Sequence, residues 1–522
     1  MVEDTTSNLQ TSNTQEKYSM RSIMALRDDY QNHLREHHFF KWLHSQNVSL
    51  EKKFDFIPAM AVFVMNFRDM NLWVIRFNEG NDQFKAVINS STIEDETHSR
   101  LFLEDWRKFN LDDKLKWKAS DVLWWLFLSE DMEPFRKYGV EFMKLSTEDN
   151  NDPLVRFAHS EAGEACGHVF FENISPMADN LGKKNNLEYR YFGSFHLDLE
   201  TGHVLESEDI FQDQQITPEQ YNKSIKLAKH MFSIFDGIHD NFLNYAKKYV
   251  ETGGLPHKKM AIDYVDNQNK STNIGYIPSK NFQIHSSQKD LESHLKYRMK
   301  NAENHSFYEW MKNDNLPALK KLQRFIPLWA VDIFGYRDLN KYVFRYNKPK
   351  TDLEYSVNTI ASNLEKHSQL FLQDWVELKL DEVLRWSGSS TLEFLFLDYF
   401  MDMHRKNLIN FAMLGLKNTN AFERLWFMEA LESSGHAFFS NTRQLALQAE
   451  EEHHIRLDYL SNRHSIVHAR KQNKTIDFKN IPLNDANTVK SINNIIDIVF
   501  DALEENLDLS LQASTLNKFS IR

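Results

Sequence analysis

Apolar residues recur at three- and four-residue intervals along most of the chain, which is the spacing of one face of an α-helix. The pattern is clear in "HSRLFLEDWRKF" from His98 and in "ASDVLWWLFL" from Ala119. It extends through the long segments 217–250 and 488–514, where Thr217 and Thr488 stand near the start as candidate N-caps. Only 15 glycines and 11 prolines interrupt 522 residues. The pattern therefore predicts an all-α protein.

The most apolar stretch, "VLWWLFLSEDMEPF" after Ser120, contains only about eight residues before its first charge. A membrane-spanning helix needs roughly 20 apolar residues. The stretch therefore predicts a buried helix, with Ser120 as its N-cap.

The helical pattern occurs twice, in the same order. Matched pairs are Trp42 with Trp310, Pro58 with Pro327, His98 with His367, Trp117 with Trp386, Glu161 with Glu429, His168 with His436, Tyr191 with Tyr459, and His196 with His464. Every pair is separated by 268 or 269 residues, a register that chance does not keep. A repeat of more than 200 residues can bury a core of its own, so we interpret it as a duplicated domain.

The repeat predicts a division of the chain into two similar domains with polar segments around them. The expected parts are a polar tail at 1–30, a first domain at 31–250, a connector at 251–299, a second domain at 300–512 and a tail at 513–522.

Charge and cysteine content narrow the range of partners and locations. The formal net charge of -12 gives no electrostatic footprint for nucleic acid or for an anionic membrane, so we expect neither as a partner. The single cysteine, Cys166, excludes an intrachain disulfide framework and suits a reducing compartment. The polar N-terminus contains no apolar signal region, so we expect a cytoplasmic protein.

Two carboxylates and an imidazole form the pattern Glu161-x-x-Glu164-x-x-x-His168, which recurs as Glu429-x-x-Glu432-x-x-x-His436. Residues three, four and seven positions apart share one face of a helix. By itself this pattern fits a solvated helix face with a packed histidine as well as it fits a metal site.

Two further clusters in the first copy favour a metal site. Glu94 and Asp95 precede His98 by four and three residues, and His196, Glu200 and His203 are spaced by four and three. Carboxylates and imidazoles from separate helices are how a bundle builds an inward-facing iron or manganese site. An alternative for 196–203 is a hairpin around Thr201-Gly202, because glycine weakens a helix.

At these residues the chain resembles the heme-oxygenase-like diiron oxidases and oxygenases. The resemblance rests on the order of three segments: a carboxylate just before a histidine, a central glutamate, and a His-x-x-x-Asp/Glu-x-x-His run. It implies two tandem heme-oxygenase-like helical bundles and a metal site formed by Glu94, Asp95, His98, Glu161, Glu164, His168, His196, Glu200 and His203. Which of Glu94 and Asp95, and which of Glu161 and Glu164, binds metal stays open, as does the role of His168.

The resemblance also implies an activity. It predicts an oxidoreductase that holds two ferrous ions, with manganese as the alternative metal, and uses O2 on a small-molecule metabolite. An external electron donor and a homodimer are further expectations.

The second copy departs from this pattern. His468 stands in the place of Glu200, Lys471 in that of His203 and Asn363 in that of Glu94. We therefore expect a degenerate site there, with a single metal held by Glu429 or Glu432 and nearby histidines as an alternative. For the whole chain, the competing hypothesis is a metal-free helical protein that binds a partner or a small ligand.

Overall fold

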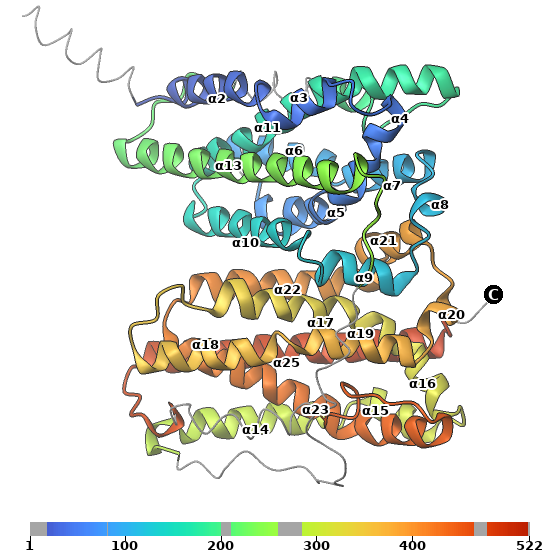
Figure 1. Cartoon of the computed structure of the whole chain (residues 1–522). Coiled ribbons are helices and arrows are strands. Elements are labelled where there is room, and N and C mark those ends of the chain that lie inside the picture. Colours follow the sequence, from blue (N-terminus) through green and yellow to red (C-terminus); the bar gives the residue numbers. More distant parts are fainter. Residues whose placement is uncertain (1–17, 81, 200–209, 259–283, 464–477, 520–522) are drawn as a thin grey trace, which may run out of the picture. The chain divides into compact units, whose positions relative to one another are not determined.

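The computed structural model describes residues 18–80, 82–199, 210–258, 284–463 and 478–519. Within them the chain forms two compact units (Figure 1). Unit 1 comprises residues 1–116 and 129–256, and unit 2 comprises 117–128 and 257–522.

Helices of very different lengths build unit 1. They are α2 (Met20–Arg35), α3 (His38–His44), α4 (Leu50–Lys53), η1 (Phe54–Ala59), α5 (Ala61–Met70), η2 (Asn71–Ile75), α6 (Gln83–Asp95), α7 (His98–Lys108), α8 (Leu111–Leu115), α10 (Glu133–Glu148), α11 (Pro153–Asn185), α13 (Pro218–Tyr245) and η3 (Ala246–Val250). The long helices α11 and α13 pack against each other, and α2 packs on both.

Unit 2 contains the helices of the second copy together with α9 from the first copy. They are α9 (Ala119–Phe127), η4 (Ser286–Gln288), α14 (Lys289–Glu303), α15 (Ser306–Asn313), α16 (Ala318–Phe325), η5 (Ile326–Trp329), α17 (Ala330–Asp338), η6 (Leu339–Phe344), α18 (Asp352–Leu364), α19 (His367–Glu377), α20 (Leu380–Leu384), α21 (Gly388–Leu397), α22 (Tyr399–Lys417), α23 (Ala421–His453), η8 (Phe478–Asn480) and α25 (Ala486–Thr515). Here α23 and α25 are the packed long pair, and α14 lies on both.

The prediction of an all-α protein is confirmed. No strand is present in the described residues, whose one isolated β-bridge joins Ser19 and Gln215. No described helix is both long and apolar enough to cross a membrane. The assignment of both copies to the heme-oxygenase-like fold stays a prediction.

The repeat seen in the sequence extends to unusual details of the backbone. Helices α11 and α23 both have 33 residues. A π-helical turn follows α5 as η2 and follows α17 as η6. Left-handed residues flank the short helix α8 at Asn110 and Lys116, and they flank α20 at Lys379 and Arg385. Such matched irregularities indicate that the two copies share one backbone plan.

The three predicted N-caps had different outcomes. Thr217 caps α13 through a capping box with Gln220, as predicted. The prediction of Thr488 as an N-cap is wrong, because Asp485 caps α25 and accepts from the backbone N–H of Thr488. The prediction of Ser120 as an N-cap is also wrong, because α9 begins at Ala119 and Ser120 is its second residue.

Helix α9 comes from the first copy of the repeat but lies in unit 2. It packs against α19, α20 and α21. Asp381 fixes its start, because its carboxylate accepts from the Ser120 N–H at 2.9 Å and the Ser120 hydroxyl at 2.5 Å. The same carboxylate accepts from the Trp375 indole N–H at 3.0 Å. A residue of the second copy therefore satisfies the helix end for which the sequence suggested Ser120.

A buried aspartate in each unit holds the segment that follows the 33-residue helix. In unit 1 the fully buried Asp105 accepts the backbone N–H groups of Arg190, Tyr191 and Phe192 at 3.0, 2.8 and 3.0 Å. Burial raises the pKa of Asp105 to about 6, against the lowering effect of these hydrogen bonds.

Asp374 has the equivalent role in unit 2. It accepts from the backbone N–H groups of Tyr459 and Leu460 at 3.1 and 2.7 Å. Burial raises its pKa well above the usual value. In both units, a buried aspartate on a helix thus holds the backbone of a segment that lies far later in the sequence.

We predict that Asp381→Ala lowers the free energy of unfolding by about 1–3 kcal/mol, because it leaves the Ser120 and Trp375 donors without their acceptor. Denaturant unfolding of the whole chain measures the change. The neighbouring exposed residue gives a matched control, Glu382→Ala, which should change stability little. Equal effects of the two substitutions would contradict the assigned role of Asp381.

The raised pKa of Asp105 predicts a loss of stability as the pH rises. Between about pH 4 and pH 6 the folded protein holds this proton more tightly than the unfolded chain, so the stabilisation is present below about pH 4 and lost above pH 6. A shift of roughly two pKa units corresponds to about 3 kcal/mol. Unfolding measured across pH 4–7 should show this decrease in the wild type and a smaller one in Asp105→Asn. Parallel pH profiles for the two proteins would exclude the assignment.

Candidate functional site

The candidate site of unit 1 lies where α6, α7 and α11 meet the helical turn 194–199. That turn contains His196, and its described part is helical, which favours the helix over the hairpin for these residues. The segment that leads into this turn is held by Asp105, which accepts hydrogen bonds from the backbone of residues 190–192. The position of His196 is therefore set from α7, the helix that begins with His98.

The imidazoles of His98 and His196 face each other. Their Nε2 atoms are 2.9 Å apart, and the two residues are only 5% and 0% exposed. The Nδ1 of His196 is 2.9 Å from the backbone carbonyl of Tyr191. A carbonyl only accepts, so Nδ1 carries the hydrogen and the lone pair of a neutral His196 lies on Nε2. This is the arrangement that metal-binding histidines commonly use.

Aspartate and aromatic side chains surround this pair. The Asp95 carboxylate, 2% exposed, lies 3.7 Å from the Nε2 of His98. The ring of Phe67 is parallel to that of His98, with centroids 6.1 Å apart, and Phe171 lies 4.0 Å from the ring of His196. The two imidazoles are thus held in a largely apolar enclosure with one carboxylate beside them.

A small cavity continues from Asp95 towards α11. Its volume is about 30 Å³, and its polar lining includes Asp95, Glu161 and Glu164. A space of this size holds about two water molecules. Carboxylates predicted from three- and four-residue spacings on separate helices therefore do line one interior space.

Glu161 has a cationic partner that the sequence analysis did not identify. The Arg27 guanidinium, on α2, lies 3.2 Å from the Glu161 carboxylate, and both side chains are nearly buried. Arg27 also contacts Asp28 at 2.8 Å. Glu161 is therefore already paired with a cation of the protein, which it shares with Asp28.

The described residues contain no complete metal site. No group of three or more His, Cys, Asp and Glu side chains within them is placed to hold a metal ion as it stands. The Nε2 atoms of His98 and His196 are nevertheless only 2.9 Å apart, so both imidazoles would be able to donate to one ion. With Asp95 beside them, the donor types fit one iron or manganese ion after a small side-chain movement.

The other predicted ligands are less closely associated with this pair. Glu94 precedes Asp95 on α6 and is partly exposed, whereas Asp95 is buried. His168 lies on α11 with its Nδ1 3.2 Å from Glu172. Glu200 and His203 lie outside the described residues. A second metal ion, which would need them, is therefore a prediction from the sequence alone.

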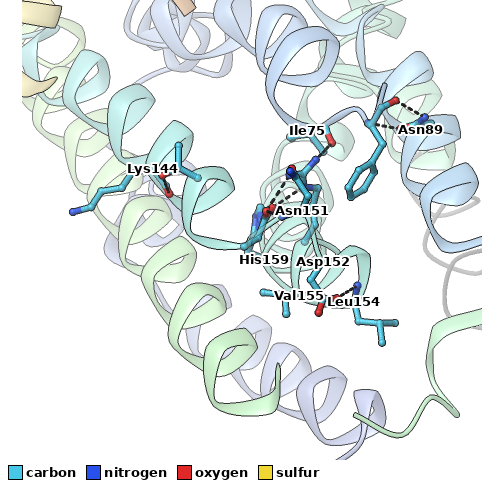
Figure 2. A network of polar contacts seen from close by, with 12 residues as sticks. Ile75, Asn89, Lys144, Asn151, Asp152, Leu154, Val155 and His159 are labelled. Carbon is cyan, nitrogen blue, oxygen red and sulfur yellow. Dashed lines mark hydrogen bonds and ion pairs between the residues drawn. The ribbon is translucent and has the colours of Figure 1, made fainter. Parts of the chain in front are cut away.

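A buried polar network holds the wall of the cavity between η2 and α11. Arg156 donates to the carboxylate of Asp149 at 2.6 and 3.0 Å and to the carbonyl of Ile75 at 2.9 Å, and Figure 2 shows Ile75, Asn151 and His159 grouped around these contacts. Although burial alone would raise it, hydrogen bonds from His159 and Arg156 keep the Asp149 pKa below its usual value. Burial lowers the pKa of His159, which favours its neutral form.

The equivalent region of unit 2 is differently occupied. The Lys479 ammonium lies 2.6 Å from Glu429 and 3.1 Å from Glu292. Glu429 matches Glu161 of unit 1, whose cationic partner is Arg27. Burial and the charge of Glu429 raise the pKa of Glu432 to about 7, while Lys479 lowers it.

Unit 2 also lacks the buried aspartate of the unit 1 site. Leu364 occupies the position that matches Asp95, next to Asn363. His464, His468 and Lys471, which the sequence analysis compared with the third segment, lie outside the described residues.

No family model matches the chain, and no curated protein matches it. The resemblance to diiron oxidases therefore stays an expectation drawn from the order of the motifs.

Proposed function

We propose that the chain is a non-heme oxidase or oxygenase that uses iron or manganese and O2 on a small molecule, with its site in unit 1. One observation carries the proposal: two buried imidazoles from distant parts of the chain present their Nε2 atoms to each other at 2.9 Å, beside a buried carboxylate. Imidazoles combined with carboxylates suit iron and manganese better than a structural zinc site.

Each side chain has a definable task in such a site. His196 binds through Nε2, because its Nδ1 hydrogen is engaged by the carbonyl of Tyr191. His98 approaches the same point from the start of α7, and Asp95 supplies negative charge from the end of α6. The chemistry supplied by bound iron or manganese is the reduction of O2.

The pairing of Arg27 with Glu161 distinguishes the two central glutamates. A guanidinium that contacts a carboxylate competes with a metal ion for its charge and makes it a weaker ligand. Both glutamates line the cavity next to Asp95. We therefore assign Glu164 as the metal-binding glutamate and Glu161 as a positioning residue held by Arg27.

The size of the cavity limits what else can bind. A volume of about 30 Å³ admits small molecules such as water, so a larger substrate requires side chains around the cavity to move. The chain has only one cysteine and hence no intrachain dithiol, so electrons that the substrate does not supply must come from an external donor.

A metal-free helical protein that binds a partner or a small ligand is the second candidate. The observation in its favour is that the same atoms satisfy one another without a metal. His98 and His196 can share one hydrogen between their Nε2 atoms, and Arg27 balances Glu161. Metal binding separates the two candidates directly.

We predict that anaerobic reconstitution with ferrous iron loads the wild type and that His98→Ala and His196→Ala each remove at least about half of the iron, because each deletes an imidazole donor. Metal counting on the separated protein measures this. The matched control is His367→Ala, since His367 occupies the position of His98 in the second copy.

Two results would contradict the proposal. A wild type that binds neither iron nor manganese would leave the metal-free protein as the surviving candidate. Full iron content in His196→Ala would remove this histidine from the site.

We also predict that Glu164→Gln weakens Mn²⁺ binding by more than tenfold, whereas Glu161→Gln weakens it by less, because Glu161 is held by Arg27. Electron paramagnetic resonance of free Mn²⁺ during a titration gives both affinities. The reverse order would assign Glu161 as the ligand instead.

A further inference from the structure

A second cavity in unit 1 lies between α2, α11 and α13. Its volume is about 10 Å³, which is the room that one small molecule needs. Most of its lining is apolar, including Met20 and Met24 from α2 and Ala158 from α11. Its two polar lining residues, Arg27 and Glu161, are paired with each other at 3.2 Å. A buried water needs several polar partners, so this lining favours an apolar occupant.

Unit 2 fills the matching space with its own side chains. Three residues of the cavity lining have these counterparts in the second copy: Ala158 matches Trp426, Met24 matches Glu292 and Glu161 matches Glu429. The Lys479 ammonium lies 3.1 Å from Glu292, 2.6 Å from Glu429 and 5.6 Å from the ring centre of Trp426. The counterparts of the cavity lining therefore close around a lysine, and the backbone plan shared by the two copies does not require an open space here.

The cavity adjoins the candidate metal site. Phe157 and Glu161 line both this cavity and the larger one beside Asp95. A molecule in the first cavity therefore reaches the second when these two side chains move. Methionine side chains are unbranched and adaptable, so Met20 and Met24 adjust to an occupant slightly larger than water.

We propose that this cavity binds O2 and supplies it to the candidate metal site past Phe157. O2 is a neutral, apolar, diatomic molecule, which suits both the volume and the lining of the cavity. The use of the bound O2 rests on the proposed function. Its binding in the cavity does not, because the apolar lining is present without a metal ion.

Nuclear magnetic resonance of the metal-free full chain under O2 pressure tests the proposal, with ¹³C in the methionine methyl groups. O2 is paramagnetic and speeds the relaxation of nuclei beside it, and N2 at the same pressure gives the diamagnetic reference. The internal controls are Met65 and Met401, which are fully buried and line neither of the two cavities. We expect the relaxation enhancement at Met20 and Met24 to be at least about twofold larger than at the controls. Equal enhancement at all four methyl groups would overturn the proposal.

A variant tests whether the cavity itself holds the O2. Ala158→Trp introduces the residue that the second copy carries at the matching position, and its side chain should fill the cavity. We expect the enhancement at Met24 to fall to the level of Met65. Ala158→Leu adds less volume and gives the same comparison where the tryptophan variant does not fold. An unchanged enhancement in a folded variant would place the O2 elsewhere and overturn the proposal.

Iron loading separates this inference from the proposed function. The same variant should bind as much ferrous iron as the wild type, because Ala158 has no donor atom in its side chain, but should consume O2 at least about twofold more slowly. Metal binding without the excess enhancement at the two methionines would retain the proposed function and overturn the O2 cavity. The excess enhancement in a protein that binds neither iron nor manganese would retain the cavity and overturn its role in supplying a metal site.

Discussion

The candidate site of unit 1 depends on one buried carboxylate. Asp105 lies on α7 and accepts hydrogen bonds from the backbone N–H groups of residues 190–192, more than eighty positions later in the chain. The carbonyl of Tyr191 then receives the Nδ1 hydrogen of His196, and the opposite side of that ring meets His98 at the start of α7. Both imidazoles are therefore positioned from a single helix, one directly and the other through the aspartate.

The two units keep the same backbone plan and differ in which interior positions are polar. In both, the first glutamate of the repeated pattern is paired with a cation from another element, Arg27 in unit 1 and Lys479 in unit 2. Those cations occupy different places in the sequence of each copy, so the charge balance arose from different residues. The second copy is consequently better described as altered in its chemistry than as an eroded version of the first.

Much of the fold could be predicted from the sequence, because helical periodicity and the repeat are local or regular signals. The sequence also singled out His98 and His196, whose side chains lie together in the structure, because each stands in a short motif on its own segment. The roles of Arg27, Asp105 and Lys479 could not be predicted, because their partners lie far away in the sequence and carry no spacing signal. Ser120 shows the same limit at a helix end: the group that satisfies it is Asp381, 261 residues later.

The placement of α9 has a consequence for any attempt to divide the protein. Residues 117–128 leave unit 1 and complete unit 2 before the chain returns, so the order of residues along the chain does not coincide with the grouping of helices in space. A fragment that begins after residue 256 would lack a helix of its own unit, and a fragment that ends there would carry that helix with its partners missing. The first copy thus supplies one helix to the second unit, so cutting the chain at its connector would not yield two complete units.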